Sequence, residues 1–316
     1  MSTQALLHVE GVSRYYGDRC AVRHLDLAVA RGEVVGLLGV NGAGKTTALQ
    51  MLSGNLAPSS GRIVIGGHDL ARAPCRAKQA LGYLPDQPPL YRDMSVVEYL
   101  QYAARLHGMS GRDARQAVAR VMARCELTEV AQRLIGNLSK GFRQRVGIAQ
   151  AVVHEPVLVI LDEPTVGLDV VQMQAIRRLV RELATQHGVI LSTHMLAEVE
   201  AVCDRVEILH AGQVVYRHTL AEGRSVGSTL LARAQLLAPP AIERLRALPG
   251  VIEADYSAPG WLQAQVSDYG LFAEALTRAA VSEGWRLVEV APLQRSLEQV
   301  FLAAIRDDAP AAVRTP

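Results

Sequence analysis

Apolar and polar residues alternate along the first part of the chain, from residue 6 to about residue 67, with tight glycine turns between the short runs. This period of two predicts short β-strands, which we interpret as an antiparallel β subdomain. Within the same region, residues 33–38 form a nearly continuous apolar run, typical of a strand buried in a parallel sheet. A helix is predicted to follow over about 45–53, where Gly54 stops it.

The pattern becomes helical between residue 88 and about residue 155. Ser95 and Glu98 have the spacing of a capping box, which predicts the start of a helix that runs to about Leu106. Two further helices are predicted over 112–125 and 139–153. These helices form a block inserted into the first domain.

Strand patterns return at 157–161 and 189–192, and a helical pattern over about 170–186 separates them. Strands that alternate with helices indicate a parallel sheet. The first domain, residues 1–225, is therefore predicted to be an α/β parallel sheet that carries the antiparallel β subdomain and the helical block.

The composition changes after about residue 225, where Gly223, Gly227 and Ser228 indicate a hinge. The elements beyond it have the order β-α-β-β-α-β, which is that of the ferredoxin-like fold. They are strands near 229–236, 251–256, 261–266 and 285–290, and helices over 240–247 and 270–282. A final helix is predicted to open at Ser296, and residues 307–316 are expected to be a disordered tail. This gives a small α+β accessory domain over 226–306.

Composition narrows the classes of function that the chain can have. Hydrophobic residues make up 49% of its 316 residues, enough for one large core and one small core. The net charge of +2 gives no electrostatic case for binding nucleic acid, so we expect no such partner. The four cysteines form no CxxC pair, which disfavours a metal cluster or a disulfide framework. No signal-peptide pattern is present, and the apolar runs are far shorter than the roughly 20 residues that span a bilayer.

A glycine-rich loop follows the apolar run at 33–38. Residues 39–46 fit the pattern G-x-x-x-x-G-K-[ST] between a strand and a helix, which is the context of a phosphate-binding loop. Backbone N–H groups of such a loop point at phosphates, so Lys45 is expected to reach the β- and γ-phosphates and the Thr46 hydroxyl to bind Mg²⁺. The candidate nucleotide-binding residues here are Gly39, Asn41, Gly42, Ala43, Gly44, Lys45, Thr46 and Thr47.

Two carboxylates end the apolar strand predicted at 157–161. Asp162 suits a Mg²⁺ ligand at the carboxyl edge of a parallel sheet. Glu163 follows it and is a candidate general base for the attacking water. The alternative is a strand that ends in a solvated acidic turn, since Pro164 comes next.

Residues 6 to about 220 resemble the nucleotide-binding subunit of an ABC (ATP-binding cassette) transporter. The resemblance rests on the segments above and on 138–142, Leu-Ser-Lys-Gly-Phe, which is similar to the family's Leu-Ser-Gly-Gly-Gln motif. It implies that Ser139 and the N–H of Gly141 contact the γ-phosphate held by another subunit, although Ser139 is also a good N-cap. Two positions depart from the family: Lys140 replaces a glycine and Phe142 replaces the glutamine, whose amide contacts are not carried over.

Three more residues match motifs of the family. Asp169 ends a segment similar to the D-loop, which implies a place at the subunit interface, and an N-cap role is its alternative. His194 matches the switch histidine, which contacts the γ-phosphate and Glu163 and which we class with Glu163 and Lys45 as catalytic. Tyr16 resembles the aromatic residue that stacks on adenine, with Tyr15 or a core tyrosine as alternatives.

The family's glutamine that senses Mg²⁺ and water should follow residues 82–85, where this chain has Asp86 and then Gln87. By position we favour Asp86 as the residue near the metal, and Gln87 is the alternative. The next segment, 88–91, would face the membrane partner in this family.

The resemblance implies an ATPase with ATP and Mg²⁺ as cofactors. Two copies would close head-to-tail around two ATP and drive a separate transmembrane permease, from a cytoplasmic position on the inner face of the membrane. Residues 82–91, 138–145 and the C-terminal domain are similar to an exporter branch that includes gliding-motility, copper-processing and drug-resistance ATPases. The alternatives are a soluble ABC-type ATPase that acts on ribosomes or DNA, and a regulator without turnover. The C-terminal domain is expected to support packing or the dimer.

Overall fold

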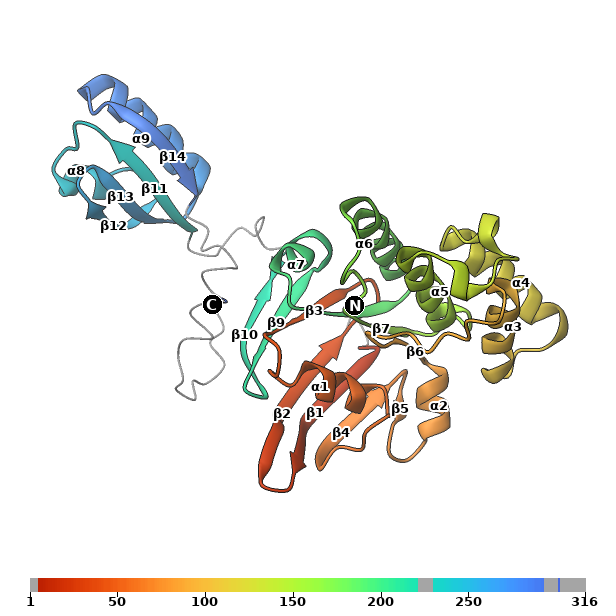
Figure 1. The fold of residues 1–316 in the computed structure, drawn as a ribbon. Helices are drawn as coiled ribbons and strands as arrows, with labels where there is room; N and C mark the ends of the chain where they lie inside the picture. Colours follow the sequence, from red (N-terminus) through yellow and green to blue (C-terminus); the bar gives the residue numbers. More distant parts are fainter. Residues whose placement is uncertain (1–4, 221–229, 293–300, 302–316) are drawn as a thin grey trace. The chain divides into compact units, whose positions relative to one another are not determined.

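The computed structural model describes residues 5–220, 230–292 and 301 of the chain (Figure 1). These residues divide into two compact units, one before and one after the undescribed stretch at 221–229. No helix within the described ranges is long and apolar enough to cross a membrane.

A six-stranded sheet with the strand order β10-β9-β3-β8-β7-β6 forms the centre of the first unit. Neighbours from β9 to β6 run parallel, and β10 adds an antiparallel edge. Every residue of β3, β7 and β8 is buried, which explains their apolar runs. The bounds are β3 (Val34–Leu38), β6 (Leu81–Leu84), β7 (Leu158–Asp162), β8 (Gly188–Thr193), β9 (Arg205–His210) and β10 (Gln213–Thr219).

The predicted antiparallel subdomain is confirmed as a four-stranded sheet with the order β2-β1-β4-β5. It comprises β1 (Leu7–Tyr16), β2 (Arg19–Val29), β4 (Ser60–Ile65) and β5 (His68–Asp69). Helix α1 (Lys45–Leu52) lies between this sheet and the six-stranded one (Figure 1). Its residues Ala48, Leu49, Met51 and Leu52 are fully buried in one core with residues from both sheets. This packing fixes the start of α1, where the phosphate loop ends.

The inserted helical block is confirmed and contains α3 (Val96–Leu106), α4 (Gly111–Arg124) and α5 (Lys140–Val152), with short 3₁₀ turns at Thr128–Val130 and Ile135–Asn137. The predicted capping box is present at the start of α3. The Ser95 N–H donates to Glu98 Oε2 at 2.9 Å, and the Glu98 N–H donates to Ser95 Oγ at 3.4 Å. The remaining helices of this unit are α2 (Pro74–Gln79), α6 (Val170–Ala184) and α7 (Leu196–Val202).

Several short elements, among them β6, β9 and β10, are not predicted by the pattern of the sequence. In β9 the charges of Arg205 and Glu207 interrupt the apolar run. Glu207 is nevertheless 1% exposed, because Arg205 and Arg217 pair with it. A buried charge is tolerated only when it is paired, and a pairing partner cannot be found from local periodicity.

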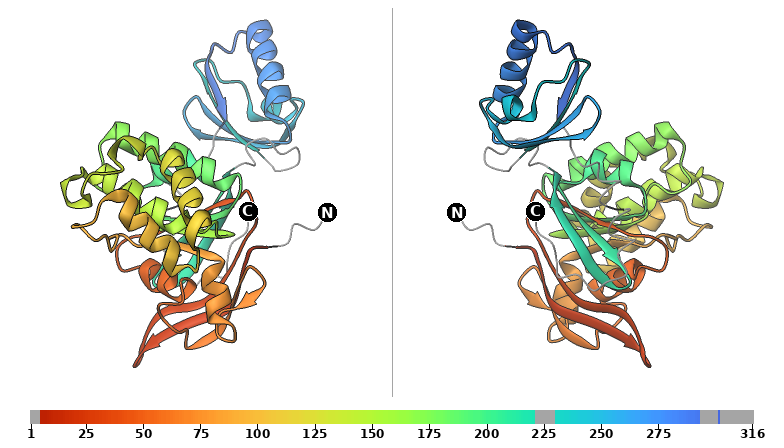
Figure 2. Two further views of the ribbon diagram at one scale, coloured as in Figure 1. Left: turned by 90° about the vertical axis from the view of Figure 1, so that its right-hand side faces the viewer. Right: turned by 90° about the vertical axis from the view of Figure 1, so that its left-hand side faces the viewer.

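The second unit contains β11 (Leu230–Leu236), α8 (Ile242–Arg246), β12 (Val251–Ala258), β13 (Trp261–Val266), α9 (Tyr269–Glu283) and β14 (Leu287–Pro292). Its sheet has the order β12-β13-β11-β14 with all neighbours antiparallel, which confirms the ferredoxin-like prediction. Helix α9 packs on one face of this sheet (Figure 2), and its residues Phe272 and Leu276 are fully buried in the core of the unit. The predicted hinge, the helix start at Ser296 and the tail lie outside the described residues.

Candidate nucleotide-binding site

The candidate residues gather at one edge of the six-stranded sheet, because β3, β8, β7 and β6 are consecutive parallel neighbours. The carboxyl ends of parallel strands meet at the same edge, where α/β proteins bind their ligands. The phosphate loop follows β3, His194 follows β8, Asp162 ends β7 and Asp86 comes shortly after β6. The register aligns Asp162 with Ser192, and Leu38 with Thr193.

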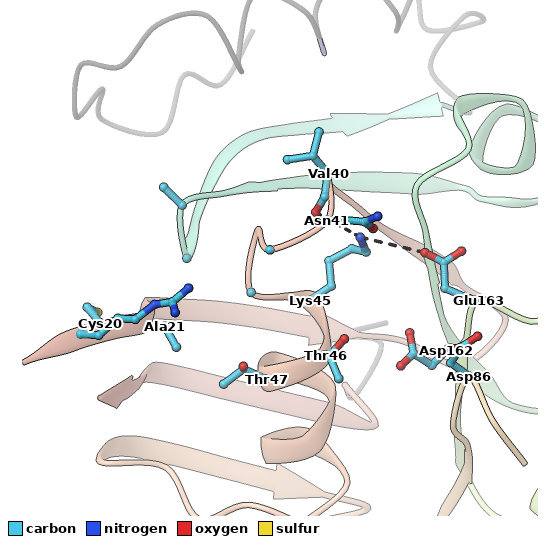
Figure 3. Close-up of a pocket in the computed structure, with 15 residues that line it drawn as sticks. Cys20, Ala21, Val40, Asn41, Lys45, Thr46, Thr47, Asp86, Asp162 and Glu163 are labelled. Carbon is cyan, nitrogen blue, oxygen red and sulfur yellow. Dashed lines mark hydrogen bonds and ion pairs between the residues drawn. The ribbon is translucent and has the colours of Figure 1, made fainter. Parts of the chain in front are cut away.

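A cavity of about 520 Å³ opens at this edge (Figure 3). Most of the predicted phosphate-loop residues line it, together with Asp86, Asp162 and Glu163. Gly39 and Ala43 belong to the loop but not to the cavity wall. The lining residues are Arg19, Cys20, Ala21, Val40, Asn41, Gly42, Gly44, Lys45, Thr46, Thr47, Asp86, Asp162, Glu163, Ala211 and Gly212.

The glycines of the phosphate loop are required by its close contacts. A Cβ atom on Gly39 would lie 2.6 Å from the Leu209 carbonyl oxygen, and one on Gly44, where φ is +103°, would lie 2.6 Å from that of Ala21. Backbone carbonyls cannot yield as a flexible side chain does, so larger residues would displace the loop.

Lys45 lines the cavity and is buried. Its ammonium donates to the Gly39 carbonyl at 2.6 Å and lies 4.0 Å from Glu163 Oε1 (Figure 3). Burial lowers the pKa of Lys45, while the negative charges of Glu163 and Asp162 act to raise it. The lysine is therefore held inside the loop, close to both carboxylates.

The two carboxylates at the end of β7 have different surroundings. Asp162 is 4% exposed, and burial raises its pKa, with the negative charges of Glu163 and Asp86 acting in the same direction. Glu163 has a φ of +48°, a region that residues with a side chain rarely adopt. Its N–H donates to the Ser192 carbonyl at 3.0 Å, which holds this backbone conformation. Such local strain is concentrated at functional sites.

His194 contacts Glu163 although it does not line the cavity. Its Nδ1 lies 2.9 Å and 3.0 Å from the two carboxylate oxygens of Glu163. This contact gives the Glu163 carboxylate a defined orientation, which the predicted role of a general base would require. Lys45, Glu163 and His194 are thus brought together, as three groups that span the loop and the ends of β7 and β8.

The oxygen donors in the cavity suit Mg²⁺, which prefers hard oxygen ligands. Thr46, Asp86 and Asp162 all line it, whereas Gln87 does not. The described residues hold no cluster of three or more His, Cys, Asp or Glu side chains that would bind a metal by themselves. This donor set fits an ion held by one or two protein oxygens together with phosphates and water.

Tyr16, the predicted adenine-stacking residue, does not line the cavity. It is 47% exposed, and the guanidinium carbon of Arg14 lies 4.8 Å from its ring centroid, which occupies one face of the ring. Arg19, Cys20 and Ala21 of β2 line the cavity. The sequence contains no local signal for these three, since their place depends on how the β1–β2 hairpin packs against the loop.

The segment predicted to contact the nucleotide of another subunit lies outside the cavity of its own chain. Ser139 is the N-cap of α5 and accepts from the Phe142 N–H at 3.4 Å; Asp169 is the N-cap of α6 and accepts from the Gln172 N–H at 2.8 Å. A Cβ atom on Gly141 would lie 2.5 Å from Gln172 Oε1, so the starts of these helices are in contact. The N-cap alternatives for Ser139 and Asp169 are therefore present, and they do not conflict with a role at an interface.

The site combines a phosphate loop between a strand and a helix, an acidic strand end and a histidine directly after the neighbouring strand. The loop and the acidic strand end define a P-loop nucleoside triphosphatase. The family model described as "ABC transporter" matches residues 22–166. The chain is 40% identical over 202 residues to the ABC transporter ATP-binding protein NatA of Bacillus subtilis, which covers 63% of this chain and 82% of NatA. It is 33% identical over 308 residues to the daunorubicin resistance ATP-binding protein DrrA3 of Streptomyces coeruleorubidus, covering 95% and 96%.

A solved structure titled "Structure of ATP binding subunit of ABC transporter" matches with a TM-score of 0.63 and 34% identity, over 69% of this chain and 92% of the other. CbiO1 of Clostridium perfringens, part of the transporter complex cbiONQ, matches with a TM-score of 0.63 and 29% identity, over 69% and 90%. The chain belongs to the ATP-binding subunits of ABC transporters. It binds ATP, and its ATP hydrolysis is coupled to transport.

Proposed function

We propose that two copies of this chain close around two ATP molecules, and that each site combines the 39–46 loop of one copy with Ser139 and Gly141 of the other. One observation carries this proposal: the chain exposes Ser139 at the start of α5, away from the cavity that holds its own phosphate loop. A helix N-terminus attracts anions. The start of α5 in one copy would therefore supply N–H and hydroxyl donors to the γ-phosphate that is bound in the cavity of the other copy. Asp169 would lie at the same interface.

In the closed site, different residues of the chain bind the phosphates, activate the water and hold the metal ion. Lys45 exchanges its contacts with the loop carbonyls for the β- and γ-phosphates, which neutralise its charge. Glu163 accepts a proton from the attacking water, and His194 holds the Glu163 carboxylate in position. Thr46 and Asp162 are the proposed Mg²⁺ ligands, with Asp86 nearby; the ion, when bound, neutralises charge on the β- and γ-phosphates.

Substitution of Glu163 by glutamine tests the sandwich, because it keeps the shape of the side chain and removes the base. Glu163→Gln should bind ATP, hydrolyse it slowly and elute as a dimer in gel filtration with light scattering. ADP should leave it monomeric, since only the γ-phosphate joins the two copies. Ser139→Ala in the same background should weaken the dimer. A Glu163→Gln protein that binds ATP and stays monomeric at high protein concentration would show the model to be wrong.

We further propose that the chain drives a separate transmembrane permease for export, on the inner face of the cell membrane. Relatives named for resistance, such as DrrA3 and the linearmycin resistance protein LnrL of Bacillus subtilis, support this direction of transport. Tyr91, 53% exposed, makes edge-to-face contacts with Tyr99 and Tyr102, at centroid distances of 6.0 Å and 5.7 Å. Tyr99 is buried and Tyr102 is 39% exposed, so Tyr91 is an exposed aromatic residue held by two others, which suits a protein interface.

The permease surface can be tested with two tyrosines of similar exposure. Tyr91→Ala should reduce co-purification with the permease in detergent and abolish its stimulation of ATPase activity, while the basal rate of the free subunit stays unchanged. Tyr15, which is 45% exposed and belongs to β1 of the four-stranded sheet, is the matched control. Equal effects of Tyr91→Ala and Tyr15→Ala would argue against this surface.

The second unit is proposed to support the dimer rather than to bind a ligand. It has its own core, built from strand residues and from Phe272, Leu276 and Trp285, so the first unit need not depend on it to fold. A chain that ends at residue 225 should therefore fold and form a weaker ATP-dependent dimer in the Glu163→Gln background. Unchanged dimerisation and coupling would contradict this role.

A further inference from the structure

Ser192 carries a hydroxyl group into the fully buried strand β8. Its residue is 0% exposed, and the three residues before it in the strand are apolar. Taking a hydroxyl out of water costs free energy unless the group finds a hydrogen-bonding partner. Ser192 Oγ has no partner of ordinary hydrogen-bond geometry among the described residues. A polar group buried in this way requires an explanation.

The strand register places the Ser192 side chain beside the carboxylate of Asp162. The parallel strands β7 and β8 pair Asp162 with Ser192, and β3 pairs Leu37 with Ser192 on the other side. Residues in register on neighbouring strands point to the same face of a sheet. Leu37 offers only carbon atoms there, whereas the Ser192 hydroxyl is close enough to the Asp162 carboxylate to act as a donor that lowers its pKa.

The Asp162 carboxylate has no other side-chain hydrogen-bond donor acting on it within the described part of the chain. It is 4% exposed and lines the nucleotide cavity together with Thr46 and Asp86 (Figure 3). A carboxylate that binds a metal ion is held in orientation by hydrogen bonds from groups behind it. Loss of such a group typically lowers metal affinity or activity by roughly 10–100-fold.

The backbone of Ser192 contacts the second carboxylate of the site. Its carbonyl accepts from the Glu163 N–H at 3.0 Å and so supports the left-handed conformation of that residue. This contact does not involve the hydroxyl. Replacement of Ser192 by alanine therefore removes the group beside Asp162 and leaves the support of Glu163 in place.

We propose that Ser192 is a positioning residue for the metal site: its hydroxyl donates to the Asp162 carboxylate and holds it in the orientation that binds Mg²⁺. Ser192 does not line the cavity, so it acts through Asp162 and not on the nucleotide. This inference rests on the proposed Mg²⁺ role of Asp162. It does not depend on the dimer.

The affinity of the full-length protein for the non-hydrolysable β,γ-imido analogue of ATP tests the proposal, measured by calorimetry with Mg²⁺ and again with EDTA. The ratio of the two Kd values reports what the metal ion contributes. Ser192→Ala should reduce this ratio by about tenfold. The Kd in EDTA should not change, because the phosphate loop is intact, and this also shows that the variant is folded.

Ser53→Ala is the matched control, since it makes the same chemical change at another buried position. Ser53 is 4% exposed, and its hydroxyl donates to the Gln50 carbonyl at 3.1 Å, outside the cavity wall. The ratio should stay at the wild-type value in this variant. An equal loss in Ser53→Ala would show that any buried hydroxyl has this effect, and the specific role of Ser192 would be wrong.

The double variant Ser192→Ala/Asp162→Asn separates this inference from the metal role of Asp162. Asp162→Asn alone should reduce the ratio strongly, and adding Ser192→Ala should cause no further loss, because Ser192 acts through that carboxylate. A reduced ratio in Asp162→Asn with a wild-type ratio in Ser192→Ala would refute the role of Ser192 alone. A wild-type ratio in Asp162→Asn would overturn both the Mg²⁺ role of Asp162 and this inference.

Discussion

The ion pair between Arg177 and Glu198 joins the helix that follows Asp169 to the helix that follows His194. Both Arg177 Nε and one of its terminal nitrogens donate to Glu198 Oε1, at 3.0 Å and 2.5 Å. Glu198 is 1% exposed, whereas the Arg177 side chain is 28% exposed. The ion pair therefore connects the buried face of α7 with a partly solvent-exposed face of α6.

Replacing Arg177 by methionine should destabilise the first unit by about 3 kcal/mol. Removal of one partner of a buried pair costs roughly 3–5 kcal/mol, because the other charge is left uncompensated, and the partial exposure of Arg177 places this case at the low end. The Arg177→Met/Glu198→Met double variant should recover most of the loss, since it buries no charge. Arg178→Met, an exposed arginine next to it in α6, should change stability by less than about 0.5 kcal/mol.

The chain offers an internal control for this measurement. It has two tryptophans, Trp261 and Trp285, and both are in the second unit. Urea unfolding followed by far-UV circular dichroism should show a shifted transition in Arg177→Met, while the tryptophan fluorescence transition stays in place. A shift below about 0.5 kcal/mol, or no recovery in the double variant, would refute the reasoning.

Three other predictions follow from the site and the sheet. His194→Ala should lower kcat by roughly a hundredfold with little change in ATP affinity, because it loses the contact that orients Glu163; single-turnover rates check this, and an unchanged rate would contradict it. Gly82→Ala should prevent folding, because its Cβ atom would lie 2.1 Å from a carbonyl oxygen of α5. Gly108→Ala, with open space around it, should lower the free energy of unfolding by only about 1 kcal/mol, as measured by thermal unfolding. Asp162→Asn should abolish ATP hydrolysis and yet raise the free energy of unfolding at pH 7. The folded pKa of Asp162 is raised, so its ionisation removes stability as the pH rises through that pKa, and the gain over wild type should vanish below about pH 3.9 in pH-dependent urea titrations.

The sequence alone predicted the parts of the site that depend on local chemistry. The phosphate loop requires glycines at close contacts and a lysine at the helix start, so residues 39–46 can be recognised without a structure. The strand at 158–162 can also be predicted from the sequence, because burial on both faces requires a continuous apolar run. The ferredoxin-like order of the second unit also follows from the periods of its elements, since each has a single buried face.

Tertiary structure decided which residues surround these motifs. Arg19 and Ala211 come from hairpins whose place in the cavity depends on contacts between distant segments, and no local pattern encodes such contacts. The sequence pattern did not predict strand β9, because charged residues interrupt its apolar run. Its buried glutamate is tolerated because it pairs with one arginine on β9 and one on β10. Tyr16, which the sequence predicts to stack on adenine, lies outside the cavity wall with Arg14 on its ring. Sequence thus determined the phosphate loop and the acidic strand end, because contiguous residues carry their chemistry. Only the fold determined the rest of the cavity wall, because separate strands assemble it.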